Sequence, residues 1–245
     1  MKNTGNRTIL TYVRHVQDFF RDHADPALVK KYSRYFREGY DAWGIDQKTM
    51  ETQRSIWYER WKMDLSREQL FTLGDQLMIS GKYEESILAI WILINLQKES
   101  GEGILEKAGE WLENNISNWA QTDYLSGEVI SIQLNREPLL LKELEKWRKS
   151  GSKWRRRSIP VSLIKVMKQG YDPEKLLRMI DPMMNDKIRE VHQGLGWFLR
   201  ETRKRHQNMT DRFLLDWKDT CARLIIQYAT EKMDKDQKGN YKRIK

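Results

Sequence analysis

Residues 8–23 read TILTYVRHVQDFFRDH, a stretch in which apolar side chains recur at helical spacing with charged residues between them. Ile9, Val13, Val16 and Phe20 follow one another at intervals of three or four residues, which places them along one face of a helix. The stretch therefore predicts an amphipathic helix, and Pro26 marks its end. This unit decides the fold class, because the rest of the chain repeats it.

Further helices are predicted along almost the whole chain. Residues 27–43 form the next one, and Gly44 is a natural helix stop. The same pattern recurs near 47–62, 66–78, 83–98, 102–114, 117–134, 138–148, 152–168, 173–181, 185–204 and 209–232. Strand signals are nearly absent, since there is no sustained period-two alternation and no Asn-Gly or Asp-Gly hairpin turn. The sequence thus predicts an all-α protein.

Short loops between helices of similar length predict antiparallel helix pairs stacked into a solenoid. No fixed-period consensus is visible, so a single globular helical bundle is the structural alternative. We expect one domain over residues 1–233. Residues 234–245 are polar and lack apolar periodicity, so we expect them to form a frayed tail.

The chain carries a large excess of positive charge. Its 44 Lys and Arg residues outnumber 35 Asp and Glu residues, for a formal charge of +9 over 245 residues. Such an excess favours an anionic partner, either nucleic acid or a membrane surface. The longest apolar run, around 87–96, is too short to span a bilayer, and MKNTGNRTIL at the N-terminus lacks the apolar segment of a signal peptide. We therefore expect a soluble protein that binds nucleic acid and no membrane.

Other chemistries find little support among the residues. Cys221 is the single cysteine, which excludes an internal disulfide and indicates a reduced, cytoplasmic setting. The four histidines have no metal-ligand spacing, and no glycine-rich loop could cradle a phosphate. We expect no metal and no organic cofactor. The chain also lacks a coiled-coil heptad, so we expect a monomer.

Four segments, in this order, carry a resemblance to a known family. They are KYSRYFREGYDAWGI at 31–45, NWAQTD at 118–123, SKWRRRSI at 152–159 and QGLGWFLRE at 193–201. Their order and intervals resemble those of the DNA alkylation repair family of HEAT-like-repeat glycosylases. The resemblance implies a HEAT-like helical-repeat solenoid whose basic concave face cradles duplex DNA containing alkylated bases.

The resemblance also implies site residues. Asp123 matches the catalytic carboxylate, and Trp119 and Trp197 match the aromatic positions at the lesion. Arg157 matches an arginine that contacts the DNA backbone, and Tyr35 matches an aromatic residue that lines the groove. Pro160, which follows Arg157 within the same predicted helix, deletes a backbone hydrogen bond and can kink that helix.

Two basic clusters lie close in sequence to these residues. We expect Lys153, Arg156 and Arg200 to join Arg157 in binding DNA phosphates. A run of charges is more often a solvated face, and cations also suit helix C-termini. Phosphate contact is the better interpretation for Arg157, because it matches the family pattern as well.

The chemistry of the implied reaction suits these residue types. A purine alkylated on N3 or N7 is cationic and leaves readily, so the enzyme needs mainly to stabilise the oxocarbenium-like sugar. A carboxylate such as Asp123 does this and can orient a water. Trp119 and Trp197 offer electron-rich faces to the cationic base, at about 0.5–2 kcal/mol each. Residues four apart share a helix face, so Trp119 and Asp123 can point the same way.

Two other interpretations remain open. The chain could bind distorted or branched DNA without excising a base, or it could be a helical scaffold for proteins on which Trp and Arg form adhesive surfaces. A Trp at an apolar helical position is commonly core, and a lone Asp is commonly a cap. The presence of Asp123 beside Trp119 favours the glycosylase, and the charge of +9 opposes the protein scaffold.

Overall fold

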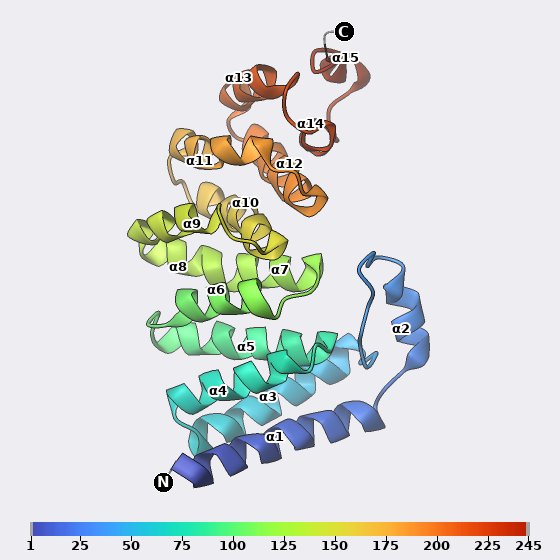
Figure 1. Ribbon diagram of the computed structural model, residues 1–245, viewed down its shortest axis with the longest axis vertical. Helices are drawn as coiled ribbons and strands as arrows, with labels where there is room; N and C mark the ends of the chain where they lie inside the picture. The colour runs from blue at the N-terminus through green and yellow to red at the C-terminus, as the bar shows by residue number, and fades with distance from the viewer. Residues whose placement is uncertain (1, 244–245) are drawn as a thin grey trace. The chain divides into compact units, whose positions relative to one another are not determined.

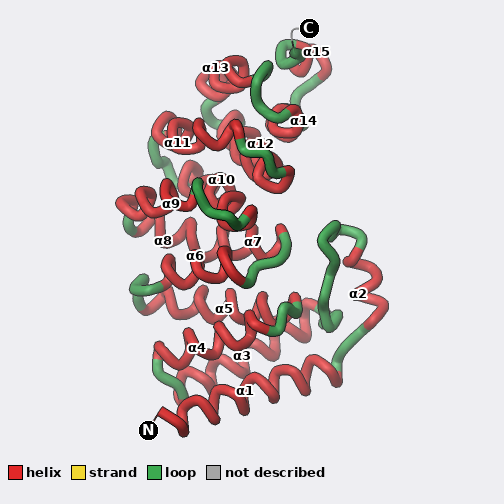
Figure 2. The backbone as a smooth tube through the Cα atoms, in the orientation of Figure 1, coloured by secondary structure: helices red, strands yellow, loops and turns green. Residues whose placement is uncertain are grey.

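The computed structural model describes residues 2–243 and consists of helices and loops, with no strand in that range (Figure 2). The predicted all-α class is confirmed. The chain divides between Gln121 and Thr122 into two compact units. This boundary lies within a helix. Breaks in the hydrophobic pattern fall in loops, so they do not predict its position.

The described part of unit 1, residues 2–121, contains six complete helices. They are α1 (Lys2–Asp22), α2 (Pro26–Ser33), α3 (Gln47–Asp64), α4 (Arg67–Ile79), α5 (Tyr83–Glu99) and α6 (Ile104–Asn114). Helix α4 packs against α1, α3 and α5, and α6 packs against α5. Figure 1 shows α2 standing apart from this stack, at the outer end of α1.

Side-chain caps start helices α3 and α4 where they are observed. Ser66 and Gln69 form a reciprocal capping box at the start of α4, and Asp46 caps α3 by accepting from the Thr49 amide. The apolar faces of α4 and α5 then bury side chains such as Leu73 and Ile92 completely. Removal of that apolar surface from water is the main force holding the helices together.

Unit 2 contains the remaining helices and the C-terminal part of α7 (Trp119–Leu125), in which the boundary falls. After a π-helical turn at Ser126–Ile130 come α8 (Ser131–Arg136), α9 (Leu141–Trp147), α10 (Lys153–Lys168), α11 (Pro173–Ile180), α12 (Arg189–Arg203), α13 (Gln207–Trp217), α14 (Arg223–Ala229) and α15 (Lys235–Gly239). Helices α8, α10, α12 and α14 pack in succession, and α9, α11 and α13 cover them. This two-layer stacking of helix pairs is the predicted helical-repeat architecture.

Two glycines allow close packing at the centre of unit 2. A Cβ on Gly196 of α12 would lie 2.4 Å from Tyr228 Cβ on α14, well inside van der Waals contact. A Cβ on Gly194 would lie 3.3 Å from Arg157 Cγ on α10. Helices α10, α12 and α14 can approach as closely as they do because these two positions carry no side chain.

The structure differs from the predicted elements in three places. The helix expected over 27–43 ends at Ser33, and the one expected over 209–232 is divided into α13 and α14. Residues 234–243, expected to fray, include α15 and pack onto unit 2: the Tyr241 ring is buried, and its hydroxyl donates to Asp211 at 2.7 Å. Arg223 and Lys218 also donate hydrogen bonds to the carbonyls of Tyr241 and Lys242. Apolar periodicity does not reveal contacts of these kinds.

Candidate active site

The centre of the candidate site is a buried ion pair between Asp123 and Arg157 in unit 2. The Arg157 guanidinium donates from Nε to Asp123 Oδ1 and from Nη2 to Oδ2, each at 2.9 Å. Its remaining nitrogen, Nη1, donates to the Glu190 carbonyl at 2.7 Å. The Arg157 side chain is 7% exposed and that of Asp123 is 15% exposed. Such a two-pronged contact fixes both the position and the orientation of the carboxylate.

Three features of the fold aim these two side chains at each other. Helix α10 begins at its cap Ser152 and continues through Pro160, so Arg157 stays within a helical turn despite the proline. Gly194 of α12 makes room for the stem of Arg157. On the other side, the π-helical turn Ser126–Ile130 begins three residues after Asp123. Insertions of this kind are frequent at functional sites, because they re-aim the neighbouring side chains.

The surroundings act on the ionisation of Asp123 in opposite directions. Burial raises the pKa of its carboxyl above the ordinary value of 3.8, because desolvation penalises the charged form. The hydrogen bonds and positive charge of Arg157 lower the pKa and so oppose that rise. The Arg157 guanidinium therefore stabilises the charged form of the buried Asp123 carboxyl.

Trp197 lies on α12 and is half-buried. Glu190, Gly194 and Trp197 follow at intervals of four and three, so they share one face of the helix. The first two of these residues contact Arg157 directly. Trp197 therefore lies one helical turn beyond Gly194 on the same face of α12.

Trp119, the other predicted aromatic residue, belongs to unit 1. Its indole Nε1 donates to the Tyr35 carbonyl at 3.1 Å, and its ring stacks on that of Phe36 with centroids 5.5 Å apart. Phe36 in turn stacks on Tyr40. The Trp119 side chain is nonetheless 37% exposed, so one face is held by the protein while indole surface remains open to a ligand. Sequence reasoning missed Phe36, although it sits among the aromatic residues of the 31–45 motif.

The predicted basic residues are mostly paired within unit 2. Arg156 binds Asp186 at 2.8 Å and the Ser150 carbonyl at 2.6 Å. Lys153 lies 3.2 Å from a Glu190 carboxylate oxygen. Arg200 pairs with Glu231, although both side chains retain partial exposure. The sequence could not show the three ion pairs, because the carboxylates of Asp186, Glu190 and Glu231 each lie 30 or more residues from their basic partners.

Two other kinds of feature are absent from the described part of the chain. Within residues 2–243, no group of three or more His, Cys, Asp or Glu side chains is arranged to hold a metal ion. No described helix combines the length and the apolar character needed to cross a membrane.

The chain matches the model of one protein family. Residues 16–233 match the family described as DNA alkylation repair enzyme. No protein with a curated description matches the chain.

Several solved structures share its fold, among them the following three. A predicted DNA alkylation repair enzyme from Enterococcus faecalis superposes with a TM-score of 0.70 at 15% identity, over 87% of this chain and 98% of the other. AlkD2 from Streptococcus mutans gives 0.60 at 18% identity, over 84% and 97%. The protein smu.31 from Streptococcus mutans UA159 gives 0.59 at 19% identity, over 76% and 92%.

Proposed function

Since the chain belongs to the DNA alkylation repair enzyme family, we propose that it is a DNA glycosylase that hydrolyses the N-glycosidic bond of cationic N3- or N7-alkylated purines in duplex DNA. The family itself supports a role in DNA repair. The observation that carries the finer proposal is the Asp123 carboxylate, buried and held by two hydrogen bonds from Arg157. We further propose that the protein acts as a monomer in the cytoplasm.

In the proposed reaction the bond between the sugar C1′ and the base nitrogen breaks, and its electron pair neutralises the cationic base. The developing oxocarbenium is stabilised by the negative charge of Asp123, which also accepts a hydrogen bond from the attacking water. The water oxygen bonds to C1′, and its proton passes to solvent. Trp197 presents an aromatic face to the cationic base, which favours charged lesions over neutral bases. Trp119 stays a candidate for the same role.

We propose a role for Arg157 that differs from the phosphate contact predicted from the sequence. All three of its guanidinium nitrogens donate within the protein, and its side chain is nearly inaccessible. We propose that Arg157 is a positioning residue, which keeps Asp123 ionised and oriented. Lys153 and Arg200, which retain exposed surface, stay candidates for phosphate contact, as does the exposed Tyr35 for the DNA groove. Arg156 is the weakest candidate, since it is tied to Asp186.

The decisive experiment measures free base released from duplex DNA containing N7-methylguanine. Asp123→Asn keeps the size of the side chain and removes its charge, so we expect release to slow at least about 100-fold under single-turnover conditions, as for other preorganised charges at a reacting centre. Asp186→Asn is the matched control: it disrupts the Arg156–Asp186 pair, another largely buried arginine–carboxylate pair of unit 2, and should retain release. Equal release by wild type and Asp123→Asn would remove Asp123 from the mechanism. No release by the wild type, with tight binding to branched DNA, would favour a binding protein.

A further inference from the structure

A cavity lies within unit 1, between helices α3 and α5. Its volume is about 340 Å³, and its lining includes Ser55 and Tyr58 of α3 and Trp91 and Asn95 of α5. Small-molecule sites in proteins have volumes of about 300–1,000 Å³, so this cavity has room for a small ligand. None of the residues that line it belongs to the proposed active site, so the cavity is a separate feature of the protein.

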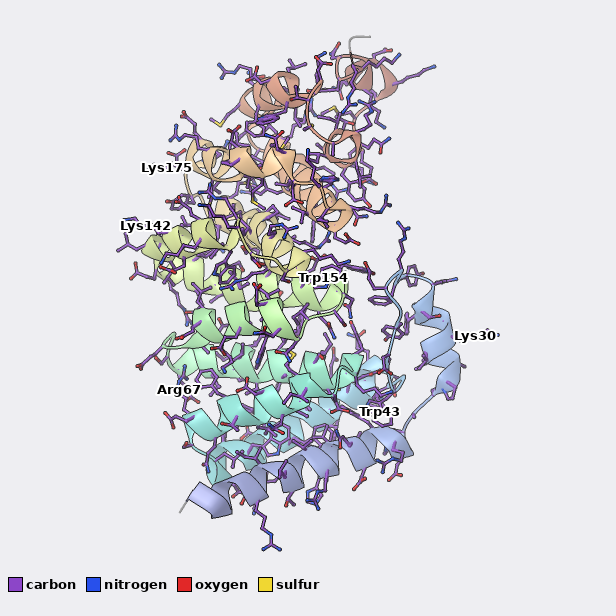
Figure 3. All side chains as sticks on the ribbon, viewed as in Figure 1. Lys30, Trp43, Arg67, Lys142, Trp154 and Lys175 are labelled. Atoms are coloured by element: carbon purple, nitrogen blue, oxygen red, sulfur yellow. The ribbon has the colours of Figure 1, made fainter. Side chains whose placement is uncertain are left out.

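The end of α5 that forms one wall of the cavity is fastened to the start of α4. The Arg67 guanidinium donates to the carbonyl of Leu96 at 3.1 Å and to that of Ser100 at 3.0 Å. Arg67 lies on the side of unit 1 away from Lys30 of α2 (Figure 3). These bonds hold the part of α5 that carries Asn95, so the protein forms this wall without a ligand.

Two side-chain atoms beside the cavity are buried without a hydrogen-bond partner among the described residues. They are the Tyr58 hydroxyl and Arg54 Nε. Tyr58 is 6% exposed, and burial, with the charge of Glu99 as the next cause, raises the pKa of its hydroxyl to about 12. The hydroxyl is therefore protonated at neutral pH and can donate. A buried polar group without a partner costs free energy, so a ligand that accepts from Tyr58 would recover that cost.

Aromatic rings form another part of the cavity wall. Tyr58 and Trp91 meet edge to face, with their ring centroids 5.3 Å apart and their planes at 85°. The Arg54 guanidinium lies over the Trp91 ring, 5.1 Å from its centroid. These contacts fix the half-buried Trp91 side chain in place. A fixed aromatic wall favours a ligand with a planar ring, because such rings pack well against each other.

Side chains that can both donate and accept hydrogen bonds line the same cavity. Asn95 Nδ2 donates to the Trp91 carbonyl at 2.8 Å, and Asn95 Oδ1 accepts from Lys98 at 2.8 Å. An amide nitrogen carries two protons, so the second one can be donated to a ligand. The Ser55 hydroxyl donates to the Glu51 carbonyl at 3.0 Å, and its oxygen can still accept.

The charged side chains at the cavity balance one another. Glu59 and Glu99 contribute negative charge, and Lys62 and Lys98 contribute positive charge. Lys62 also pairs directly with Glu59 at 2.6 Å. A wall of balanced charge favours an uncharged ligand over a nucleic-acid backbone, which is bound by an excess of cations.

We propose that this cavity binds a free purine base, a planar and uncharged ring whose edge both donates and accepts hydrogen bonds. The Tyr58 hydroxyl donates to a nitrogen or carbonyl oxygen of the base, the Asn95 amide donates to a second acceptor, and the ring packs against Trp91. The choice of a purine among planar heteroaromatic ligands rests on the proposed function, because that reaction releases free purines.

The test uses the full-length protein without DNA, so it does not depend on base release. Equilibrium dialysis with radiolabelled adenine and 7-methylguanine measures the Kd, and the wild type should bind at least one of them saturably. Tyr58→Phe removes only the hydroxyl and should raise the Kd about 3–10-fold, as expected for the loss of one neutral hydrogen bond. Its urea midpoint should not fall, because the hydroxyl has no partner in the free protein. Trp91→Leu should weaken binding as well, through the loss of the aromatic wall.

Tyr12→Phe is the matched control, because it removes a hydroxyl of unit 1 that already bonds to Asp64, and it should leave the Kd unchanged. The proposal would be overturned if the wild type bound neither purine, or if the wild type and Tyr58→Phe had equal Kd values. A lower urea midpoint for Tyr58→Phe would also overturn it, since the hydroxyl would then already have a partner. Weaker binding of duplex DNA by Tyr58→Phe, without any purine binding, would replace the purine site with a nucleic-acid contact. Purine binding by a protein that releases no base would contradict the glycosylase and support the cavity.

Discussion

The largest predicted effect on stability concerns the Asp123–Arg157 pair. Removing either residue would leave the charge of the other one buried without an ionic partner. Arg157→Met preserves the apolar stem of the side chain and removes all three donated hydrogen bonds. Asp123→Leu removes the acceptor and leaves the guanidinium unpaired. The variant that carries both changes replaces the pair with two apolar side chains.

The burial of the pair sets the size of the expected effect. Exposed ion pairs are worth about 0–1 kcal/mol, whereas breaking a buried pair by removing one partner costs about 3–5 kcal/mol. With exposed fractions of 7% and 15%, this pair belongs to the second class, toward its lower end. We therefore expect each single variant to lose about 3 kcal/mol of unfolding free energy. The double variant should lose less than either single one, since no buried charge is left without a partner.

Urea denaturation followed by circular dichroism measures these three free energies and their coupling. The loss of unfolding free energy caused by Arg157→Met should also become smaller at acidic pH. Without its cation the folded Asp123 carboxyl has a pKa raised further above the unfolded value, so the penalty is present at neutral pH and disappears as the pH falls through that pKa. The buried-pair reasoning would be refuted if each single variant lost less than about 1 kcal/mol of unfolding free energy and the loss in the double variant equalled the sum of the two.

Three further predictions concern the packing of unit 2 and the chemistry of the proposed site. Gly196→Ala should destabilise the protein by about 1–3 kcal/mol, because its Cβ would meet Tyr228 at 2.4 Å; an unchanged urea midpoint would contradict this close approach. Base release should decline on acidification with a midpoint above 3.8, because burial raises the pKa of Asp123 and its charge is required. A single-turnover rate that stays level down to about pH 4 would remove that requirement. Phe36→Ala should slow release by freeing the Trp119 ring, while the Kd for undamaged duplex changes little; equal rates would show that Trp119 needs no stacking partner.

The helices were predictable wherever apolar periodicity was continuous. The expected 47–62, 66–78, 83–98 and 102–114 correspond closely to α3, α4, α5 and α6, because each buries a face with a period of about 3.6 residues. The helix expected over 27–43 is much shorter in the structure. Its apolar residues follow the helical period, yet α2 buries none of them. Periodicity predicts a face that could be buried, and only the packing partner decides whether it is.

The site shows the same division between local and long-range information. The family resemblance assigned Asp123 to the reaction and Arg157 to a contact with the DNA backbone, without predicting a contact between the two residues. The ion pair of Arg157 with Asp123 is a contact across 34 residues, which no local pattern contains. The same holds for Arg156, whose Asp186 partner lies 30 residues away.

By itself, the sequence determined the all-helical class, most helix positions and the excess of positive charge, since these depend on local period and composition. The tertiary structure alone decided which cations are paired and which are free. It buried Arg157 against Asp123 and paired Arg156 with Asp186, whereas Lys30 of α2 stays exposed. The physical reason is that pairing depends on the distance between side chains brought together by packing, whereas the sequence specifies only how many charges there are and where they lie along the chain.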